Sequence, residues 1–221
     1  MSLGARSGAR IPHPTVPLCP GGFRERFVNG LDPYSIVSGS VFQLNPGDIY
    51  GTSLSLLGGP ILAVGATAFR NDLATDGITN VKFKVRVDFL PNNPPYPAPD
   101  DGPTLEFGIS GGATRLNFTV AREKVFDADQ RAQIAFNGGV YQAIGSTHLV
   151  VGVWYQVEVD SSSGTGAVVT ITNLTTGVVF ATLNFASPVP PYDYTQLLFS
   201  QTFSFGSGTL PGATYADILL C

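Results

Sequence analysis

The chain has 221 residues, of which 43% are hydrophobic and only 13% are charged. A chain of this length buries enough surface to fold as one domain without metals or disulfides, and its 15 Phe and 8 Tyr exclude a disordered protein. The net charge of −4 excludes a broadly basic surface, so we expect no nucleic-acid partner.

Residues 1–22 are predicted to form an extended arm. Prolines recur in it every two or three residues and exclude a helix. Up to residue 26 the chain is also basic, with four Arg against one Glu, whereas residues 27–221 carry 8 positive and 15 negative side chains. The arm is therefore expected either to dock on a neighbouring subunit or to lie in solvent near its own acidic body. The residues expected to make subunit contacts are Arg6, Arg10, Pro12, Pro14 and Pro17.

Neither the start nor the interior of the chain carries a long apolar segment. The first ten residues lack the apolar core of a secretory signal, and no stretch approaches 18 apolar residues. We therefore expect no membrane partner. Either the protein is made and used without export through a secretory signal, or a signal was removed ahead of the first residue.

From residue 23 onward the chain alternates between apolar and polar side chains, which predicts β-strands. The clearest strand covers residues 81–89, and 105–109, 116–120 and 151–159 show the same period. Further strands are expected near 23–28, 35–44, 49–57, 62–69, 132–136, 140–144, 167–174, 178–185, 197–205 and 213–220. Turn signals separate them, among them Asn45-Pro46-Gly47-Asp48, and only residues 122–135 offer a turn or two of helix. This pattern favours an all-β antiparallel sandwich or barrel.

Two consecutive strands carry the motifs of a known architecture. Residues 153–160 (VWYQVEVD), a small polar turn and residues 167–177 (AVVTITNLTTG) resemble the late hairpin of the concanavalin A-like (laminin-G-like) jelly rolls. Residues 23–28 (FRERFV) and 215–220 (YADILL) are similar to the first and last strands of that superfamily. The resemblance implies one two-sheet antiparallel jelly-roll domain over residues 23–221, preceded by the arm at 1–22.

The same resemblance implies that the first and last strands are antiparallel neighbours. Cys19 and Cys221 would then lie close enough to form a disulfide, although two free thiols remain an alternative. A cross-link between them would close nearly the whole chain.

Catalytic and metal-binding patterns are weak in this sequence. The four glutamates have no acidic neighbour at strand spacing except Glu158, whose neighbour Asp160 is expected to shape a turn. A serine-hydrolase elbow and a phosphate-binding loop are missing. Asp100-Asp101 and Asp127-Ala-Asp129 are local acidic clusters that we expect to be solvated rather than to bind calcium. We therefore expect no enzyme, no catalytic residue, no metal and no cofactor.

A glycan groove requires an aromatic platform beside polar side chains, because the apolar face of a sugar stacks on a ring. Trp154, Gln156 and Glu158 are predicted to share one face of a strand, and Tyr96 lies in a proline-rich loop that could add to it. Tyr192 and Tyr194 lie in another such loop. Packing of Trp154 beneath a loop is the alternative.

Two non-enzymatic functions follow from these features. The arm suggests a structural or assembly protein, such as a phage-like virion surface, capsid-decoration or tail component that contacts neighbouring subunits as a homo-oligomer or on another capsid or tail protein. Such a protein would be assembled in the cytoplasm and displayed on the particle surface. The alternative is a carbohydrate-binding, lectin-like module with glycans as partners, which would act outside the cell.

Overall fold

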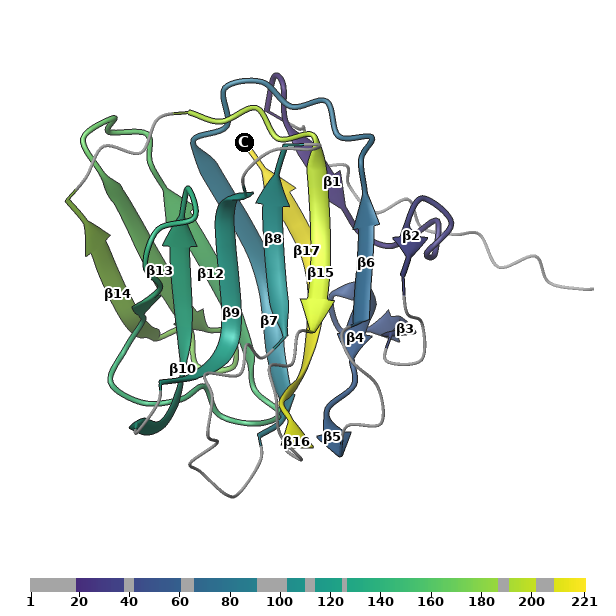
Figure 1. Cartoon of the computed structure of the whole chain (residues 1–221), viewed down its shortest axis with the longest axis vertical. Helices are drawn as coiled ribbons and strands as arrows, with labels where there is room; N and C mark the ends of the chain where they lie inside the picture. Colours follow the sequence, from purple (N-terminus) through teal and green to yellow (C-terminus); the bar gives the residue numbers. More distant parts are fainter. Residues whose placement is uncertain are drawn as a thin grey trace, which may run out of the picture.

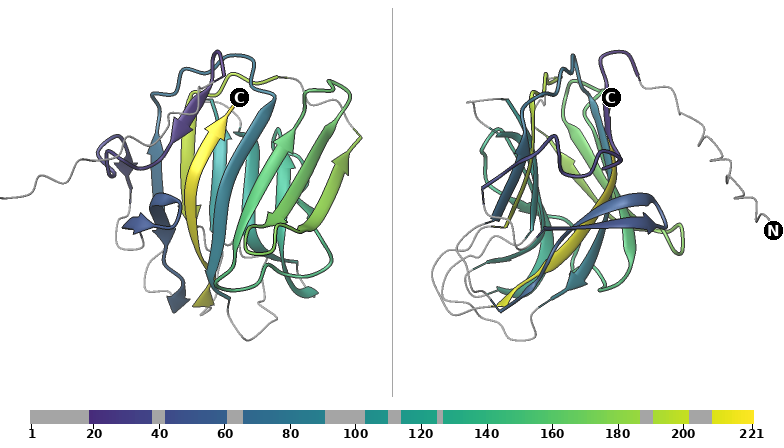
Figure 2. Two further views of the ribbon diagram at one scale, coloured as in Figure 1. Left: turned by 180° about the vertical axis from the view of Figure 1, so that it is seen from behind. Right: turned by 90° about the vertical axis from the view of Figure 1, so that its right-hand side faces the viewer.

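The computed structural model describes residues 19–37, 42–60, 66–90, 103–109, 114–124, 127–186, 191–201 and 209–221. The predicted contact residues of the arm and the predicted groove residue Tyr96 lie outside these ranges. The described residues build two β-sheets that face each other (Figure 1), and the edge-on view of Figure 2 shows the two layers. No helix long and apolar enough to cross a membrane occurs in the described ranges.

The first layer is an eight-stranded antiparallel sheet that contains both ends of the domain. Seven of its strands follow one another across the sheet, and β1 (Phe23–Glu25) pairs separately with β17 (Gly212–Leu220). The order is β14 (Val179–Phe185), β13 (Ala167–Asn173), β12 (Trp154–Asp160), β7 (Asn80–Phe89), β17 (Gly212–Leu220), β4 (Gly51–Leu56) and β3 (Phe42–Asp48).

The second layer is a seven-stranded antiparallel sheet. Its order is β11 (Gln142–Ala143), β10 (Asp127–Phe136), β9 (Thr114–Lys124), β8 (Thr104–Gly108), β15 (Gln196–Gln201), β6 (Ala66–Arg70) and β2 (Ser35–Ile36). A short ladder joins β16 (Thr209–Leu210) to β5 (Gly59–Pro60).

The core lies between the two layers and is built by the predicted alternation. On β7, Val81, Phe83, Val85 and Val87 are buried, while the lysines and arginine between them point outward. The ring of Phe83 packs edge-on against Phe118 of the opposite sheet at 5.0 Å between centroids. Two facing apolar layers of this kind remove the side chains from water and drive the folding of a sandwich.

Two local expectations are wrong. The segment Asn45–Asp48 does not turn the chain; β3 continues through it with a register shift, and the reversal falls at Ile49-Tyr50. Pro46 is tolerated there because β3 is an edge strand, where a missing N–H does not break a ladder. Residues 122–135, which offered a turn or two of helix, belong to strands β9 and β10 apart from the undescribed 125–126, because pairing along the sheet overrides local propensity.

The first and last strands are antiparallel neighbours, as the resemblance implied. Phe23 pairs with Leu220 and Glu25 with Ile218. This register brings the residues before β1 beside the C-terminus, and Cys19 and Cys221 form a disulfide with their Cα atoms 5.5 Å apart.

A buried ion pair ties the two sheets together near this end of the molecule. Glu25 on β1 accepts hydrogen bonds from Arg70 at 2.6 Å, from the hydroxyl of Tyr34 at 2.8 Å and from the backbone N–H of Phe27 at 2.6 Å. The guanidinium of Arg70 also lies 5.1 Å from the ring centroid of Phe23. Burial, and then the charge of Glu25, raise the pKa of Tyr34 far above its usual range, so its hydroxyl stays a donor.

We expect the Cys19→Ala/Cys221→Ala variant to lose stability because the disulfide closes a loop of 202 residues in the unfolded chain. The loop-entropy relation gives about 5 kcal/mol for such a loop. Unfolding in guanidinium chloride with and without a reducing agent measures the loss. The reducing agent should lower the unfolding midpoint of the parent protein only. Equal midpoints for parent and variant in the absence of the reducing agent would contradict this expectation.

We expect Arg70→Met to destabilise the fold by about 3 kcal/mol, because it leaves the Glu25 carboxylate buried without its cation. Asp72→Asn is the matched control, since Asp72 bonds the same guanidinium from a side chain that is 59% exposed. Its loss should be about 0.5 kcal/mol. Equal losses for the two variants in urea unfolding would show that burial of the Glu25 pair is not what matters.

Candidate functional site

The outer face of the eight-stranded sheet gathers the polar side chains that the sequence singled out. Across β12 and β7, Trp154 lies opposite Arg86, Gln156 opposite Lys84, and Glu158 opposite Lys82. The three predicted groove residues of β12 therefore do share one face, and each of them stands beside a cation. Glu158 forms a salt bridge with Lys82, whose ammonium nitrogen lies 2.8 Å from the carboxylate.

Trp154 is not the exposed platform that a sugar would need. Its side chain is only 5% exposed, with the guanidinium of Arg86 5.0 Å from its ring centroid and the ring of Tyr50 edge-on at 5.3 Å. Tyr192 and Tyr194 are also buried, at 5% and 1% exposure, and pack against each other in the core cluster. These three rings are therefore packing residues, and none of them offers an exposed face to a sugar.

A partly accessible ring on this face is that of Tyr50, which no pattern in the sequence singled out. The hairpin of β3 and β4 leaves the sheet and stands out from its outer face (right-hand view of Figure 2), with Tyr50 at its tip. Tyr50 is half-buried over Trp154, and its neighbour Ile49 is 72% exposed. The ammonium of Lys84 lies 4.9 Å from the Tyr50 ring centroid, which fixes the ring by a cation–π contact. Burial raises the pKa of Tyr50, so its hydroxyl remains protonated at neutral pH.

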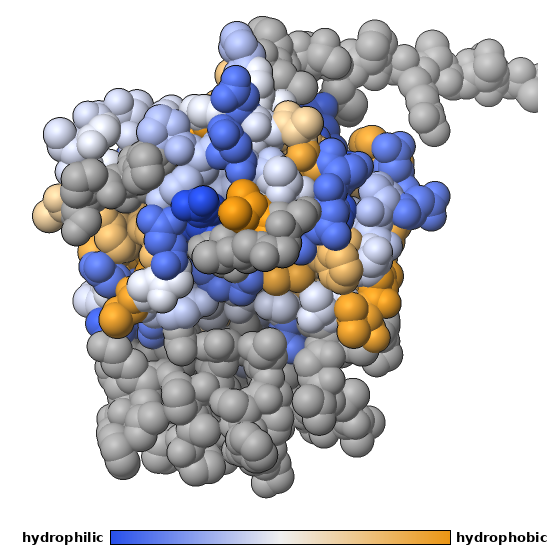
Figure 3. All heavy atoms as spheres, turned by 45° about the horizontal axis from the view of Figure 1, so that its top comes forward, coloured by the Kyte–Doolittle hydropathy of each residue, from blue (hydrophilic) through white to orange (hydrophobic). Residues whose placement is uncertain are grey.

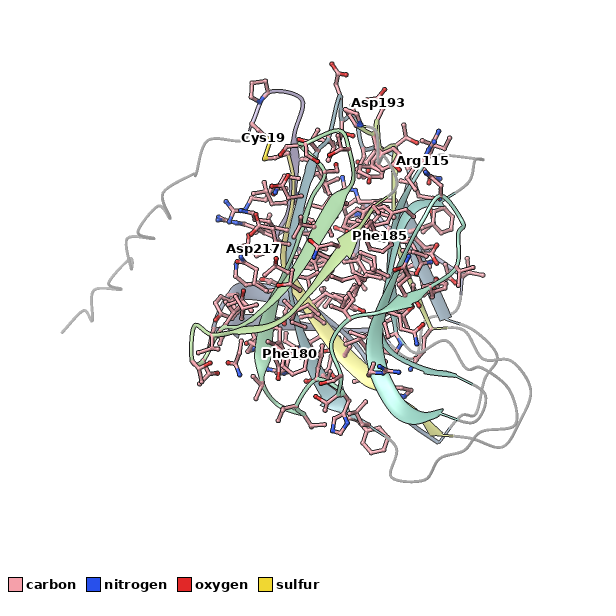
Figure 4. The ribbon with its side chains drawn as sticks, turned by 90° about the vertical axis from the view of Figure 1, so that its left-hand side faces the viewer. Cys19, Arg115, Phe180, Phe185, Asp193 and Asp217 are labelled. Atoms are coloured by element: carbon pink, nitrogen blue, oxygen red, sulfur yellow. A yellow bond between two sulfur atoms is a disulfide. The ribbon has the colours of Figure 1, made fainter. Side chains whose placement is uncertain are left out.

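Beside this ring, Asp217 collects three cations. It accepts hydrogen bonds from Arg24 at 2.8 Å and from Lys84, and Arg26 lies 3.5 Å away. The backbone of Asp217 has a φ of +48°, at a register shift in β17 between Ala216 and Leu219. A bulge of this kind re-aims a side chain, and here it turns the carboxylate to the outer face (Figure 4).

The pKa of Asp217 reflects these contacts. Burial by itself would raise the pKa of its carboxyl, but the hydrogen bonds and charges of Lys84 and Arg24 outweigh burial and lower it. The carboxylate is therefore ionised at neutral pH, and the cluster of Arg24, Arg26, Lys84 and Asp217 carries two uncompensated positive charges.

On the other side of Tyr50 the side chains carry an excess of negative charge. Arg86 bonds Asp88 at 2.6 Å and lies 3.7 Å from Asp48, so two carboxylates share one guanidinium. Ser53 donates to Asp48 at 2.9 Å, and Thr214 donates to Asp88. We use the name Tyr50 surface for Tyr50, its neighbour Trp154 and the two charged groups beside them. The residues of the two groups are Arg24, Arg26, Lys84 and Asp217 on one side, and Arg86, Asp48 and Asp88 on the other.

The outer face of the seven-stranded sheet is polar in a different way. Its central row places Glu106 on β8 between Asn117 on β9 and Leu198 on β15. Asn117 donates a hydrogen bond to Glu106, and Thr104 and Thr119 nearby are almost fully buried.

The space-filling view of Figure 3, with the top of the molecule forward, shows hydrophilic and hydrophobic residues interspersed over the described part. Within the described ranges, no three His, Cys, Asp or Glu side chains gather as metal ligands.

No protein-family model matches the chain, and no curated protein sequence matches it. Solved structures do match over most of its length. Winged bean acidic lectin complexed with methyl-α-D-galactose has a TM-score of 0.56 and 13% identity over 90% of this chain and 96% of the lectin. The exoplasmic/lumenal domain of VIP36 in its Ca2+/Man3GlcNAc-bound form has a TM-score of 0.55 and 10% identity over 86% and 84% of the two chains.

An enzyme has the same architecture. The endo-β-1,4-glucuronan lyase of the fungus Trichoderma reesei has a TM-score of 0.51 and 10% identity over 90% of this chain and 94% of the lyase. These likenesses show that the fold is the concanavalin A-like jelly-roll β-sandwich that the motifs at 153–177 predicted. They do not separate binding from catalysis, because one fold hosts both.

We expect the contribution of Asp217 to stability to depend on pH in a defined direction. Its pKa is lower in the folded than in the unfolded state, where it is about 3.9, so the stabilisation is complete above that value and disappears as pH falls through the folded pKa. The free energies of unfolding of the parent and of Asp217→Asn should therefore differ at pH 6, and the difference should shrink as the pH falls below the unfolded pKa of about 3.9. A difference that stays constant from pH 6 to pH 2 would contradict this account.

Proposed function

We propose that this protein binds carbohydrate, and that the ligand lies on the Tyr50 surface. The single observation that carries the proposal is the ring of Tyr50, held half-exposed at the tip of a projecting hairpin, packed on Trp154 and flanked by the charged side chain of Lys84. A sugar offers an apolar face for stacking and a rim of hydroxyls for hydrogen bonds, and both partners are available here.

The ring is held in place before any ligand arrives. Trp154 supports its edge and Lys84 lies against it, so little conformational freedom remains to be lost when a sugar stacks on Tyr50. The exposed side chain of Ile49 next to it extends the apolar contact. Around the ring, Arg26 is 35% exposed and Asp88 is 30% exposed, and they can exchange hydrogen bonds with hydroxyls.

The similar structures support the class of ligand. Winged bean acidic lectin was solved with methyl-α-D-galactose and VIP36 with Man3GlcNAc, and both share this fold. At 10 to 13% identity the likeness concerns the architecture, so the binding residues we propose come from the geometry of this chain alone.

Binding without catalysis is favoured because three of the glutamate carboxylates are already engaged by neighbouring side chains. Glu25 is bonded to Arg70, Glu158 to Lys82, and Glu106 to Asn117. The disulfide between Cys19 and Cys221 persists in oxidising surroundings, so we propose that the protein acts outside the reducing cytosol. The alternative role in particle assembly rests on the arm, most of which lies outside the described residues, and it stays a prediction from sequence.

The test is a glycan array followed by titration of the best ligand against variants of the ring. Tyr50→Ala should weaken binding about tenfold or more, because stacking and its area burial are worth about 1–2 kcal/mol, whereas Tyr50→Phe should retain most of the affinity.

Tyr141→Ala is the matched control, since Tyr141 precedes β11 at the edge of the other sheet. Binding that depends on Tyr141 and not on Tyr50 would move the site to the seven-stranded sheet and overturn this proposal. An array without any ligand would overturn the function as well.

A further inference from the structure

The charges around Tyr50 are unevenly placed. On one side Arg24, Arg26 and Lys84 surround the single carboxylate of Asp217, which leaves two positive charges in excess. On the other side Asp48 and Asp88 share Arg86, which leaves one negative charge. Lys84 touches both Asp217 and the Tyr50 ring, so the cationic side begins directly at the ring.

From this asymmetry we infer that the ligand of the Tyr50 surface is an acidic saccharide whose anionic group is bound by Arg26 and Lys84. This inference rests on the proposed carbohydrate-binding function and specifies its ligand class. The shared chemistry is a negatively charged oxygen group on a sugar ring, either a uronate carboxylate or a sulfate ester. Arg26 and Lys84 provide N–H donors for it, and charge-assisted hydrogen bonds of this type are stronger than neutral ones.

The exposure of the cations supports this assignment. Arg24 and Lys84 are 16% and 17% exposed, and Arg26 is 35% exposed with the longest contact to Asp217, 3.5 Å. Arg26 is therefore held least tightly by Asp217 and can reorient its guanidinium toward a ligand. Because the body of the protein from residue 27 onward is acidic, an anion gains nothing from the overall field and must be bound by this local cluster.

The orientation of the ligand follows from the same charges. With its ring stacked on Tyr50, an acidic sugar lowers its energy by turning the anionic group toward Arg26 and its hydroxyls toward Asp48 and Asp88. The opposite orientation would place like charges together. Other carboxylates of this face do not offset the cluster, because Glu158 is already bonded to Lys82 and to Asn80.

The test compares ligands that differ only in charge. Oligogalacturonate and its methyl ester form one pair, and a sulfated galactan oligosaccharide and its desulfated form make the other. We expect the charged member of at least one pair to bind about tenfold or more tightly than its neutral partner, with an affinity that falls as salt rises. The pair that shows the difference identifies whether carboxylate or sulfate is the natural group.

Two charge variants should act in opposite directions. Arg26→Gln should weaken binding of the charged ligand about fivefold, and Asp217→Asn should strengthen it severalfold by releasing the three cations. Asn tolerates a positive φ, so the bulge at position 217 survives the change. The matched controls are Arg115→Gln and Asp193→Asn, which make the same charge changes away from the cluster (Figure 4).

The outcomes separate the two proposals. Neutral and charged ligands that bind equally while Tyr50→Ala still abolishes binding would overturn the acidic-ligand inference alone. The same result follows if Arg26→Gln has no more effect than Arg115→Gln. If none of the four oligosaccharides binds while the glycan array yields a neutral ligand that depends on Tyr50, only the acidic-ligand inference is wrong. If the array yields no ligand, or if binding does not depend on Tyr50, both the inference and the proposed site are wrong.

Discussion

The bulge at Asp217 is the constraint on which the rest of this molecule depends. Before it, β17 pairs along one edge with β4, through residues 213–215; after it, the same edge pairs with β1, through residues 218–220. Because β4 leaves the edge where β1 arrives, the hairpin of β3 and β4 is free to stand out from the sheet. The arriving β1 brings Arg24 to the carboxylate that the bulge has turned outward. One irregularity in a central strand thus creates both the projecting ring of Tyr50 and the cations beside it.

The same exchange of neighbours holds the ends of the chain in place. Once β1 lies against the last residues of β17, Cys19 and Cys221 are adjacent and can be joined. Glu25 then meets Arg70 from the other sheet, so a charged pair inside the sandwich fixes the position of β1 relative to β6. The proposed site and the stabilising contacts therefore share a short segment, residues 19–27, and changes there should affect both.

This arrangement gives a physical reason for placing the proposed binding surface on the eight-stranded sheet. A flat outer face of alternating charged side chains would be solvated and would offer no apolar platform. The hairpin supplies that platform by laying Tyr50 over Trp154, and Lys84 serves both the ring and Asp217. Positive charge in excess at one side and negative charge at the other make the surface directional, which neutral stacking alone does not provide.

The sequence by itself determined the repeating features of this protein. Alternation along residues 81–87 and 155–159 predicted which side chains are buried, because period-2 burial is a local property of the chain. The resemblance of the motifs at 153–177 to a known superfamily predicted the jelly roll. Only the tertiary structure decided the site. The sequence placed Tyr50 within a predicted strand at 49–57 and not at a turn. The turn lies at residues 49–50 because of a register shift between Asn45 and Asp48, and this shift depends on the pairing with β4. Asp217 meets Lys84 and Arg24 across 133 and 193 positions of sequence, and no local pattern encodes which bulge will bring such distant charges together.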